Sequence, residues 1–124
     1  MLKKTDGLIN VIGEVATDEV ASQLVQSGQV ASKCTIFTHH ASNFKRLIMS
    51  LRNSLLKTSA FSNENIAEEQ VINVIDFDVH MEKDIYGNRY IERITECILA
   101  SEGYKENDIV VFKNNKYYVK NQIS

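Results

Sequence analysis

The sequence predicts an α/β fold that ends in antiparallel strands. Three observations indicate it. Over residues 8–74, short apolar runs rich in β-branched residues alternate with patterns of helical spacing. From Ile75 the apolar residues recur at every second position, which is the period of a half-exposed strand. Two pairs that tolerate positive φ interrupt this alternation, so they predict hairpin turns at Gly87-Asn88 and Asn114-Asn115.

The first half predicts two strands of a parallel sheet with helices between and after them. Residues 8–12 and 34–38 are short apolar runs, which favour buried strands. Three helices are expected, each after a capping position at Thr17, Ser42 or Ser62-Asn63. Their apolar stripes are Val20, Ala21, Leu24 and Val25; Phe44, Leu47, Ile48, Leu51 and Leu55; and Ile66, Ala67, Gln70, Val71 and Val74.

The second half predicts two hairpins. Residues 75–82 alternate between apolar and polar, and we expect Phe77 and Val79 to be buried on the apolar face. Residues 90–99 alternate again and complete the first hairpin. The runs 109–112 and 117–119 form a smaller one.

Composition limits the possible functions. The chain has 124 residues, 44% of them hydrophobic, and its 14 basic and 16 acidic residues leave a net charge of −2. This charge gives no electrostatic reason to expect nucleic acid or anionic lipid as a partner. No apolar run approaches the roughly 20 residues that cross a bilayer, and the first residues do not resemble a secretory signal. Cys34 and Cys97 are expected to be buried thiols in a reducing cytoplasm.

Gly13-Glu14, at the end of the first strand, is the first candidate site. Ligands of open α/β sheets bind beyond the carboxyl ends of the strands. A carboxylate placed there can orient a water or face a metal-bound phosphate, and Gly13 would let the backbone turn sharply beside it. The alternative is that Glu14 is an exposed loop acid.

Thr38-His39-His40, at the end of the second strand, is the next candidate. Neighbouring side chains on a strand point to opposite sides, so at most one histidine should face a cleft. A histidine beside phosphate could donate a hydrogen bond. The alternatives are a solvated pair, or a zinc site that adds Cys34 or His80 although no pair has zinc-ligand spacing.

Lys45, Arg46 and Arg52 lie on the predicted helix that follows the histidines. Arginine suits bidentate phosphate contacts. A solvated helix face explains these residues equally well.

Taken in order, these segments resemble the secretion-superfamily ATPases, the hexameric motors of type II secretion, type IV and tight-adherence pili, and conjugation. The resemblance covers residues 8–97 and rests on "LINVIGE", "TIFTHHAS", "LRNSLL" and "VINVIDFDVHMEKDIYGNRYIERITEC". It implies the C-terminal half of a RecA-like P-loop ATPase core with an added antiparallel hairpin region. The whole chain, 1–124, would be one partial domain. Residues 1–60 would carry the Walker B strand, histidine box and following helix, and residues 61–124 a helix and the hairpins.

The resemblance also assigns roles to residues. Glu14 matches the Walker B glutamate, which positions the attacking water and holds Mg²⁺ through water, and no residue here would bind the metal directly. Thr38 and His40 match the histidine box near the γ-phosphate, so His40 joins Glu14 as a catalytic candidate. Gly13, Thr38 and Arg52 are the candidates for nucleotide binding.

The sequence departs from the family pattern in ways that affect its activity. Ala16-Thr17 replaces an Arg-Gly pair, Gly28-Gln29 replaces a Gly-His pair, and no GxxxxGK[ST] loop is present. The resemblance implies ATP and Mg²⁺ as cofactors of the complete motor. Because the phosphate-binding loop is absent, no cofactor is expected for the isolated chain. The alternative is a non-catalytic accessory or degenerate domain of the same fold that binds a partner.

The resemblance implies partners and a location as well. They are the missing N-terminal half of the ATPase, five further copies in a homo-hexamer, and an inner-membrane secretion or pilus platform protein. No direct contact with nucleic acid is expected. The location would be cytoplasmic and peripheral, at the inner face of the cell membrane.

Overall fold

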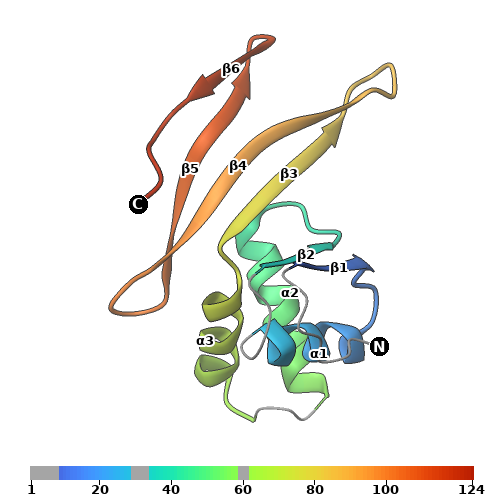
Figure 1. Cartoon of the computed structure of the whole chain (residues 1–124), viewed down its shortest axis with the longest axis vertical. Helices are drawn as coiled ribbons and strands as arrows, with labels where there is room; N and C mark the ends of the chain where they lie inside the picture. The colour runs from blue at the N-terminus through green and yellow to red at the C-terminus, as the bar shows by residue number, and fades with distance from the viewer. Residues whose placement is uncertain (1–8, 29–33, 59–61) are drawn as a thin grey trace. The chain divides into compact units, whose positions relative to one another are not determined.

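The computed structural model describes residues 9–28, 34–58 and 62–124, and the chain forms two compact units that divide between Val74 and Ile75. The first unit combines helices with a parallel strand pair, and the second is a four-stranded antiparallel sheet (Figure 1). The predicted α/β class is confirmed at this level. We expected the chain to be one domain with its halves meeting at 60/61. The division lies further along because the third helix packs on the helices that precede it.

The described residues of the first unit form two strands and three helices. Thr17 Oγ1 and Asn63 Oδ1 accept backbone N–H groups at the starts of the first and third helices, as the sequence predicts. The second helix begins later than expected, because its cap is Asn43 and not Ser42; Asn43 Oδ1 accepts the Arg46 N–H at 2.9 Å. The elements are β1 (Ile9–Glu14), α1 (Asp18–Gly28), β2 (Cys34–Thr38), α2 (Phe44–Lys57) and α3 (Glu64–Val74).

The core of the first unit lies between the helices, where α2 packs against both α1 and α3. The predicted stripe of α2 is entirely buried, and Leu51 is 0% exposed. The stripe of α3 is shifted by contrast, because Ile66 is 47% exposed and Ile72 is buried in addition. The buried apolar residues of the three helices are Ala21, Leu24, Val25, Phe44, Leu47, Ile48, Leu51, Leu55, Ala67, Val71 and Ile72.

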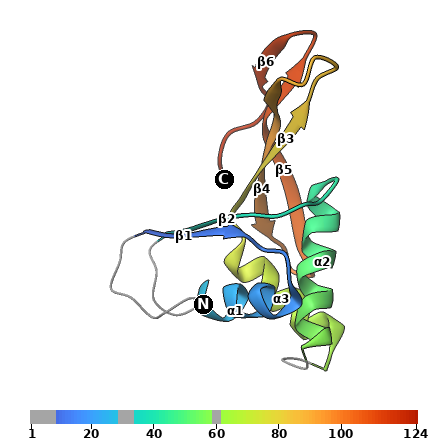
Figure 2. The same cartoon turned by 90° about the vertical axis from the view of Figure 1, so that its right-hand side faces the viewer.

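β1 and β2 form a parallel pair, joined by α1 in the crossover that parallel strands require (Figure 2). We expected both strands to be buried. Ile12 and Phe37 are partly covered, but Val11 and Ile36 on the other face are 74% and 52% exposed. The expectation is wrong for this face, because the described residues of the first unit supply no layer that covers it.

The second unit is an antiparallel meander in the order β3–β4–β5–β6. Both predicted hairpins are present. Gly87, at φ +85°, lies in the turn after β3, and Asn114 and Asn115 join β5 to β6 with φ of 50° and 60°. Only a residue that accepts positive φ fits these positions without strain. The strands are β3 (Phe77–Lys83), β4 (Arg89–Leu99), β5 (Tyr104–Lys113) and β6 (Lys116–Val119).

The expected burial of Phe77 and Val79 is wrong: their exposed fractions are 48% and 51%. The alternation correctly places them on one face, but the better-covered face of β3 is the one that carries Asp78 and His80. Thr95 on β4, paired with Asp78, is fully buried and donates from Oγ1 to Asp108 Oδ1 at 2.7 Å. The better-covered face of this sheet therefore contains polar hydrogen bonds, although the alternation predicted that this face is exposed to solvent.

Replacing Phe77 by alanine is expected to lower the free energy of unfolding by about 1 kcal/mol or less, because only half of this side chain leaves water on folding. Ile75→Ala is the matched control in the same unit, since Ile75 is 4% exposed. It should cost about 2–5 kcal/mol. Chemical denaturation of both variants measures the difference. Equal losses would mean that Phe77 is part of a core.

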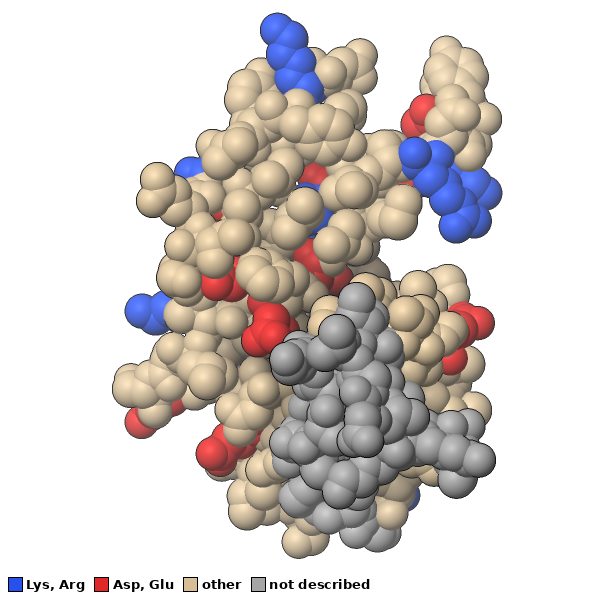
Figure 3. Space-filling model, in the orientation of Figure 1, with Lys and Arg blue, Asp and Glu red and all other residues tan. Residues whose placement is uncertain are grey.

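None of the helices in the described ranges combines the length and the apolar character of a transmembrane span. On the face shown in Figure 3, acidic and basic side chains are scattered in small groups among uncharged ones. This distribution agrees with the near-neutral net charge of the sequence.

Candidate functional site

The carboxyl ends of β1 and β2 lie side by side because the strands are parallel and Glu14 aligns with Thr38. Two hydrogen bonds close this end of the sheet. Thr38 Oγ1 donates to the Gly13 carbonyl oxygen at 3.0 Å, and the Val15 N–H donates to the Thr38 carbonyl oxygen at 2.9 Å. Gly13, Glu14 and Thr38, together with His40 just beyond β2, are called the strand-end cluster below.

Glu14 and His40 are in direct contact within this cluster. His40 Nε2 lies 2.8 Å from Glu14 Oε1, and the two side chains are 92% and 55% exposed, respectively. An exposed pair of this kind contributes about 0.2–1 kcal/mol, so it can exchange its contact for a ligand at little cost. The second carboxylate oxygen of Glu14 can accept a further hydrogen bond from water.

Gly13 contributes through its carbonyl oxygen and not through unusual backbone freedom. Its φ is outside the left-handed region, and a Cβ built on it would meet nothing within 4 Å. The sharp turn that we expected at this glycine is therefore not required. The register of β1 and β2 shifts at this position, between Ile12 and Glu14, which is the irregularity that a short bulge introduces.

His39 has partners outside the strand-end cluster. Its Nδ1 lies 3.0 Å from the Val15 carbonyl oxygen and its Nε2 lies 3.1 Å from Ser50 Oγ on α2. The two histidines have different partners, and the alternative that both are solvated is wrong for His39. Its ring is partly buried and ties the end of β1 to α2.

Arg52 lies elsewhere on α2. Its Nη1 is 3.5 Å from Glu68 Oε2 on α3, and its Nε and Nη2 donate to Asn53 Oδ1 at 3.4 and 3.3 Å. The structure thus brings four of the five candidate residues together and places Arg52 in a contact between two helices.

A pocket of about 430 Å³ lies beside His40, between the start of α1 and one face of α2. Arg46 and Lys57 supply two cationic groups to its lining. The single acid in the lining, Asp18, accepts a hydrogen bond from Ser54 Oγ at 2.7 Å. Arg46 therefore shares this pocket with His40 of the strand-end cluster, whereas Arg52 does not line it.

The zinc site considered for the two histidines is not supported by their positions. Cys34 begins β2 and His39 follows its end, so about five residues of extended chain, roughly 16 Å, separate them. His80 has a different partner, since its Nε2 lies 2.9 Å from Glu82 Oε1. Glu92 completes a cluster with these two residues. Sequence reasoning missed this cluster. The i, i+2 spacing of His80 and Glu82 on one strand face was a usable signal for these two residues, but nothing in the sequence marked Glu92.

The two thiols differ from the expectation for buried cysteines. Cys34 is exposed, and Cys97 is half-buried. Burial raises the pKa of Cys97 to about 11, and the nearby carboxylates of Asp76, Glu106 and Glu96 add to the rise. Its thiol is thus protonated at neutral pH and a poor nucleophile.

In comparisons with known proteins, no protein-family model and no curated protein matches the chain.

Proposed function

We propose that this chain supplies the Walker B glutamate and the histidine box of a hexameric secretion-superfamily ATPase, a motor for type II or IV secretion, pilus assembly or conjugative transfer. The observation that carries the proposal is the 2.8 Å contact between His40 Nε2 and Glu14 Oε1 at the carboxyl ends of two parallel strands. Sheets of this kind bind ligands at that edge. The resemblance selects these two residues from different strands, and they are neighbours in the fold.

The chemistry of the pair fits ATP hydrolysis. A carboxylate at this edge can accept a proton or a hydrogen bond from the attacking water, and half of the Glu14 side chain is open to solvent. His40 can donate from its ring to Glu14 or to a phosphate oxygen, but one N–H serves one acceptor at a time. A bound γ-phosphate would compete for that N–H and so change the position of the glutamate.

The exposed apolar face of the β1–β2 sheet supports the proposal that a further part of a larger domain covers it. Parallel sheets are normally covered on both faces. Here Val11 and Ile36 remain 74% and 52% exposed. The N-terminal half of a RecA-like core, which carries the phosphate-binding loop, is the partner that the resemblance implies for this surface. The same resemblance implies the platform protein at the inner face of the membrane.

The second candidate function is that of an accessory domain that keeps the fold and binds a partner without hydrolysing ATP. Two sequence observations favour it. The phosphate-binding loop and its lysine are absent, and Ala16-Thr17 stands where the family has Arg-Gly. In P-loop enzymes the loop and its lysine hold the β- and γ-phosphates.

Both candidates predict that the isolated chain hydrolyses ATP no faster than background. The strand-end cluster can hold a water, but it has no loop of backbone N–H groups for the phosphates. Phosphate release from purified chain with Mg²⁺-ATP measures this. A Mg²⁺-dependent turnover that Glu14→Gln removes would overturn the expectation.

The experiment that separates the two candidates is the intact mass of the native protein from its source cells. A product well above 14.1 kDa whose peptides include both GxxxxGK[ST] and this sequence supports the motor. A native product of 14.1 kDa that binds no nucleotide supports the accessory domain.

A further inference from the structure

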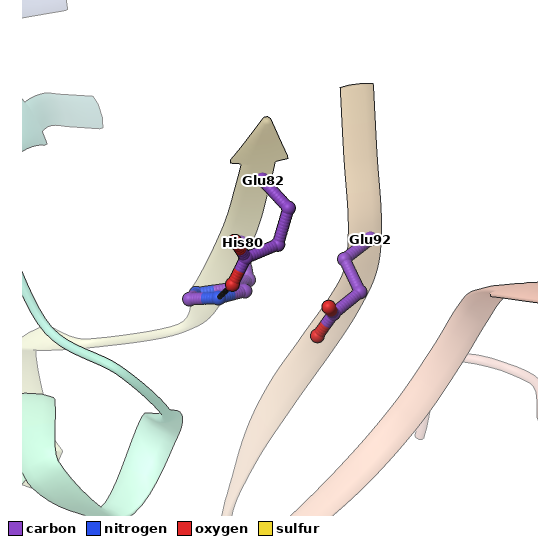
Figure 4. Close-up of side chains that lie close together, drawn as sticks. All are labelled: His80, Glu82 and Glu92. Carbon is purple, nitrogen blue, oxygen red and sulfur yellow. Dashed lines mark hydrogen bonds and ion pairs between the residues drawn. The ribbon is translucent and has the colours of Figure 1, made fainter. Parts of the chain in front are cut away.

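His80, Glu82 and Glu92 form a cluster of metal-ligand side chains in the second unit (Figure 4). One ligand atom from each residue lies within 4.8 Å of the others. His80 Nε2 and Glu82 Oε1 are only 2.9 Å apart. In Figure 4, Glu82 folds back toward the His80 ring, and the Glu92 carboxylate extends from the neighbouring strand toward both. Nothing in the proposed ATPase chemistry uses these groups.

A β-bulge makes this arrangement possible. His80 and Glu82 are two residues apart on β3 and therefore share a face. His80 pairs with Arg93 and Met81 pairs with Ile91, so Glu92 is the extra residue between them. In a regular ladder Glu92 would pair with Met81 and point to the opposite face. The bulge releases it from that pairing and turns its carboxylate toward His80, which is how bulges redirect side chains at functional sites.

The charges of the cluster favour a bound cation. Two carboxylates lie within 4.8 Å of each other, and like charges at this distance repel. Arg93, which pairs with His80 across the two strands, has its Nη1 3.5 Å from the carboxylate oxygen Oδ2 of Asp78. The imidazole is held in place, because the His80 side chain is only 11% exposed.

We propose that His80 Nε2 and the carboxylates of Glu82 and Glu92 bind one first-row divalent transition-metal ion, with Zn²⁺ as the probe. One imidazole nitrogen and two carboxylate oxygens suit such ions, whereas Mg²⁺ and Ca²⁺ take oxygen ligands in six or more positions. A tetrahedral zinc site needs ligand atoms about 3.3 Å apart, which follows from bonds of about 2.0–2.2 Å. The ligand atoms of the cluster now lie between 2.9 Å and 4.8 Å apart, so the two glutamates have to adjust to reach that spacing.

Binding would have a structural consequence. To bind the ion, His80 Nε2 gives up its hydrogen, and the imidazole stays neutral with its hydrogen on Nδ1. The ion then links β3 to β4 through Glu92. It links the two strands at the bulge, where the ladder is interrupted. Three protein ligands leave the fourth zinc position for water or another group. The metal should therefore stabilise the first hairpin.

Isothermal titration of the full chain with Zn²⁺, at neutral pH and with Mg²⁺ as the control ion, tests the proposal. One equivalent of Zn²⁺ should bind, with a dissociation constant roughly in the micromolar range. Glu82→Gln and Glu92→Gln should each weaken binding at least about tenfold. Thermal unfolding should shift upward with Zn²⁺ in the original protein and much less in either variant.

Two matched controls identify the site. Glu106→Gln removes an exposed acid of β5 in the same sheet, and His40→Ala removes the exposed histidine of the strand-end cluster. Both should bind Zn²⁺ as the original chain does. Binding that His40→Ala abolishes and Glu92→Gln leaves intact would overturn the proposal, as would absence of Zn²⁺ binding. Circular dichroism of each variant shows that it is folded, so a loss of binding can be assigned to the ligand.

Discussion

In the proposed motor, Glu14→Gln is expected to lower ATP turnover by about a hundred- to a thousandfold and to leave nucleotide affinity within about threefold. A carboxylate that orients water acts in the transition state, so its loss falls on the rate and not on ground-state binding. Glutamine keeps the size of the side chain and its ability to contact His40, but it is a far weaker base. Steady-state hydrolysis and equilibrium binding of a fluorescent ATP analogue measure the two quantities.

Glu19→Gln is the matched control for this variant. Glu19 is an exposed acid in the first turn of α1, close to Glu14 in sequence and outside the strand-end cluster. Replacing Glu19 should change neither ATP turnover nor nucleotide affinity by more than about threefold. Equal losses of affinity and rate in Glu14→Gln would instead indicate that Glu14 holds the metal or the local structure.

The helices were the most predictable part of the fold, because each carries its own signals. The α2 stripe is spaced to face one side, and all five of its predicted members are buried. The caps at Thr17 and Asn63 followed from residue type alone. These are local effects, which depend on residues three or four positions apart and not on what the rest of the chain does.

The strands were predictable only in part. Alternation correctly assigned Phe77 and Val79 to one face, but which face is covered depends on a second layer that alternation does not encode. The same limit explains Val11 and Ile36. Both are apolar residues in a parallel sheet, and both are exposed in the described structure.

The candidate site shows the same division between local and long-range information. Adjacent ends of parallel strands follow from topology, so the meeting of Glu14 and His40 could be anticipated. The role of His39 could not, because its partner Ser50 lies on α2 and depends on how that helix packs. Glu92 was also beyond reach, since a bulge changes the parity of a strand at a position that the sequence does not mark.

In the proposed motor, replacing each of the two histidines by alanine is expected to have a different effect. His40→Ala should reduce ATP turnover by about ten- to a thousandfold, the scale of losing one well-placed polar contact to developing charge. It should leave stability nearly unchanged, because the side chain is 92% exposed. His39→Ala should keep turnover within about threefold at a temperature where the protein is folded. It should lower the free energy of unfolding by about 1–3 kcal/mol, because Val15 O and Ser50 Oγ lose their partner.

Measuring turnover and chemical denaturation on both variants separates catalysis from structure, and His39→Gln adds a third comparison. Glutamine can still hydrogen bond, so it should restore part of the stability that alanine removes. If His39→Ala loses turnover without losing stability, the functional histidine is one residue earlier than the resemblance places it. If neither histidine affects turnover, the 2.8 Å contact between His40 and Glu14 is an ordinary surface pair. The accessory-domain function would then be favoured, since the proposed motor depends on that contact.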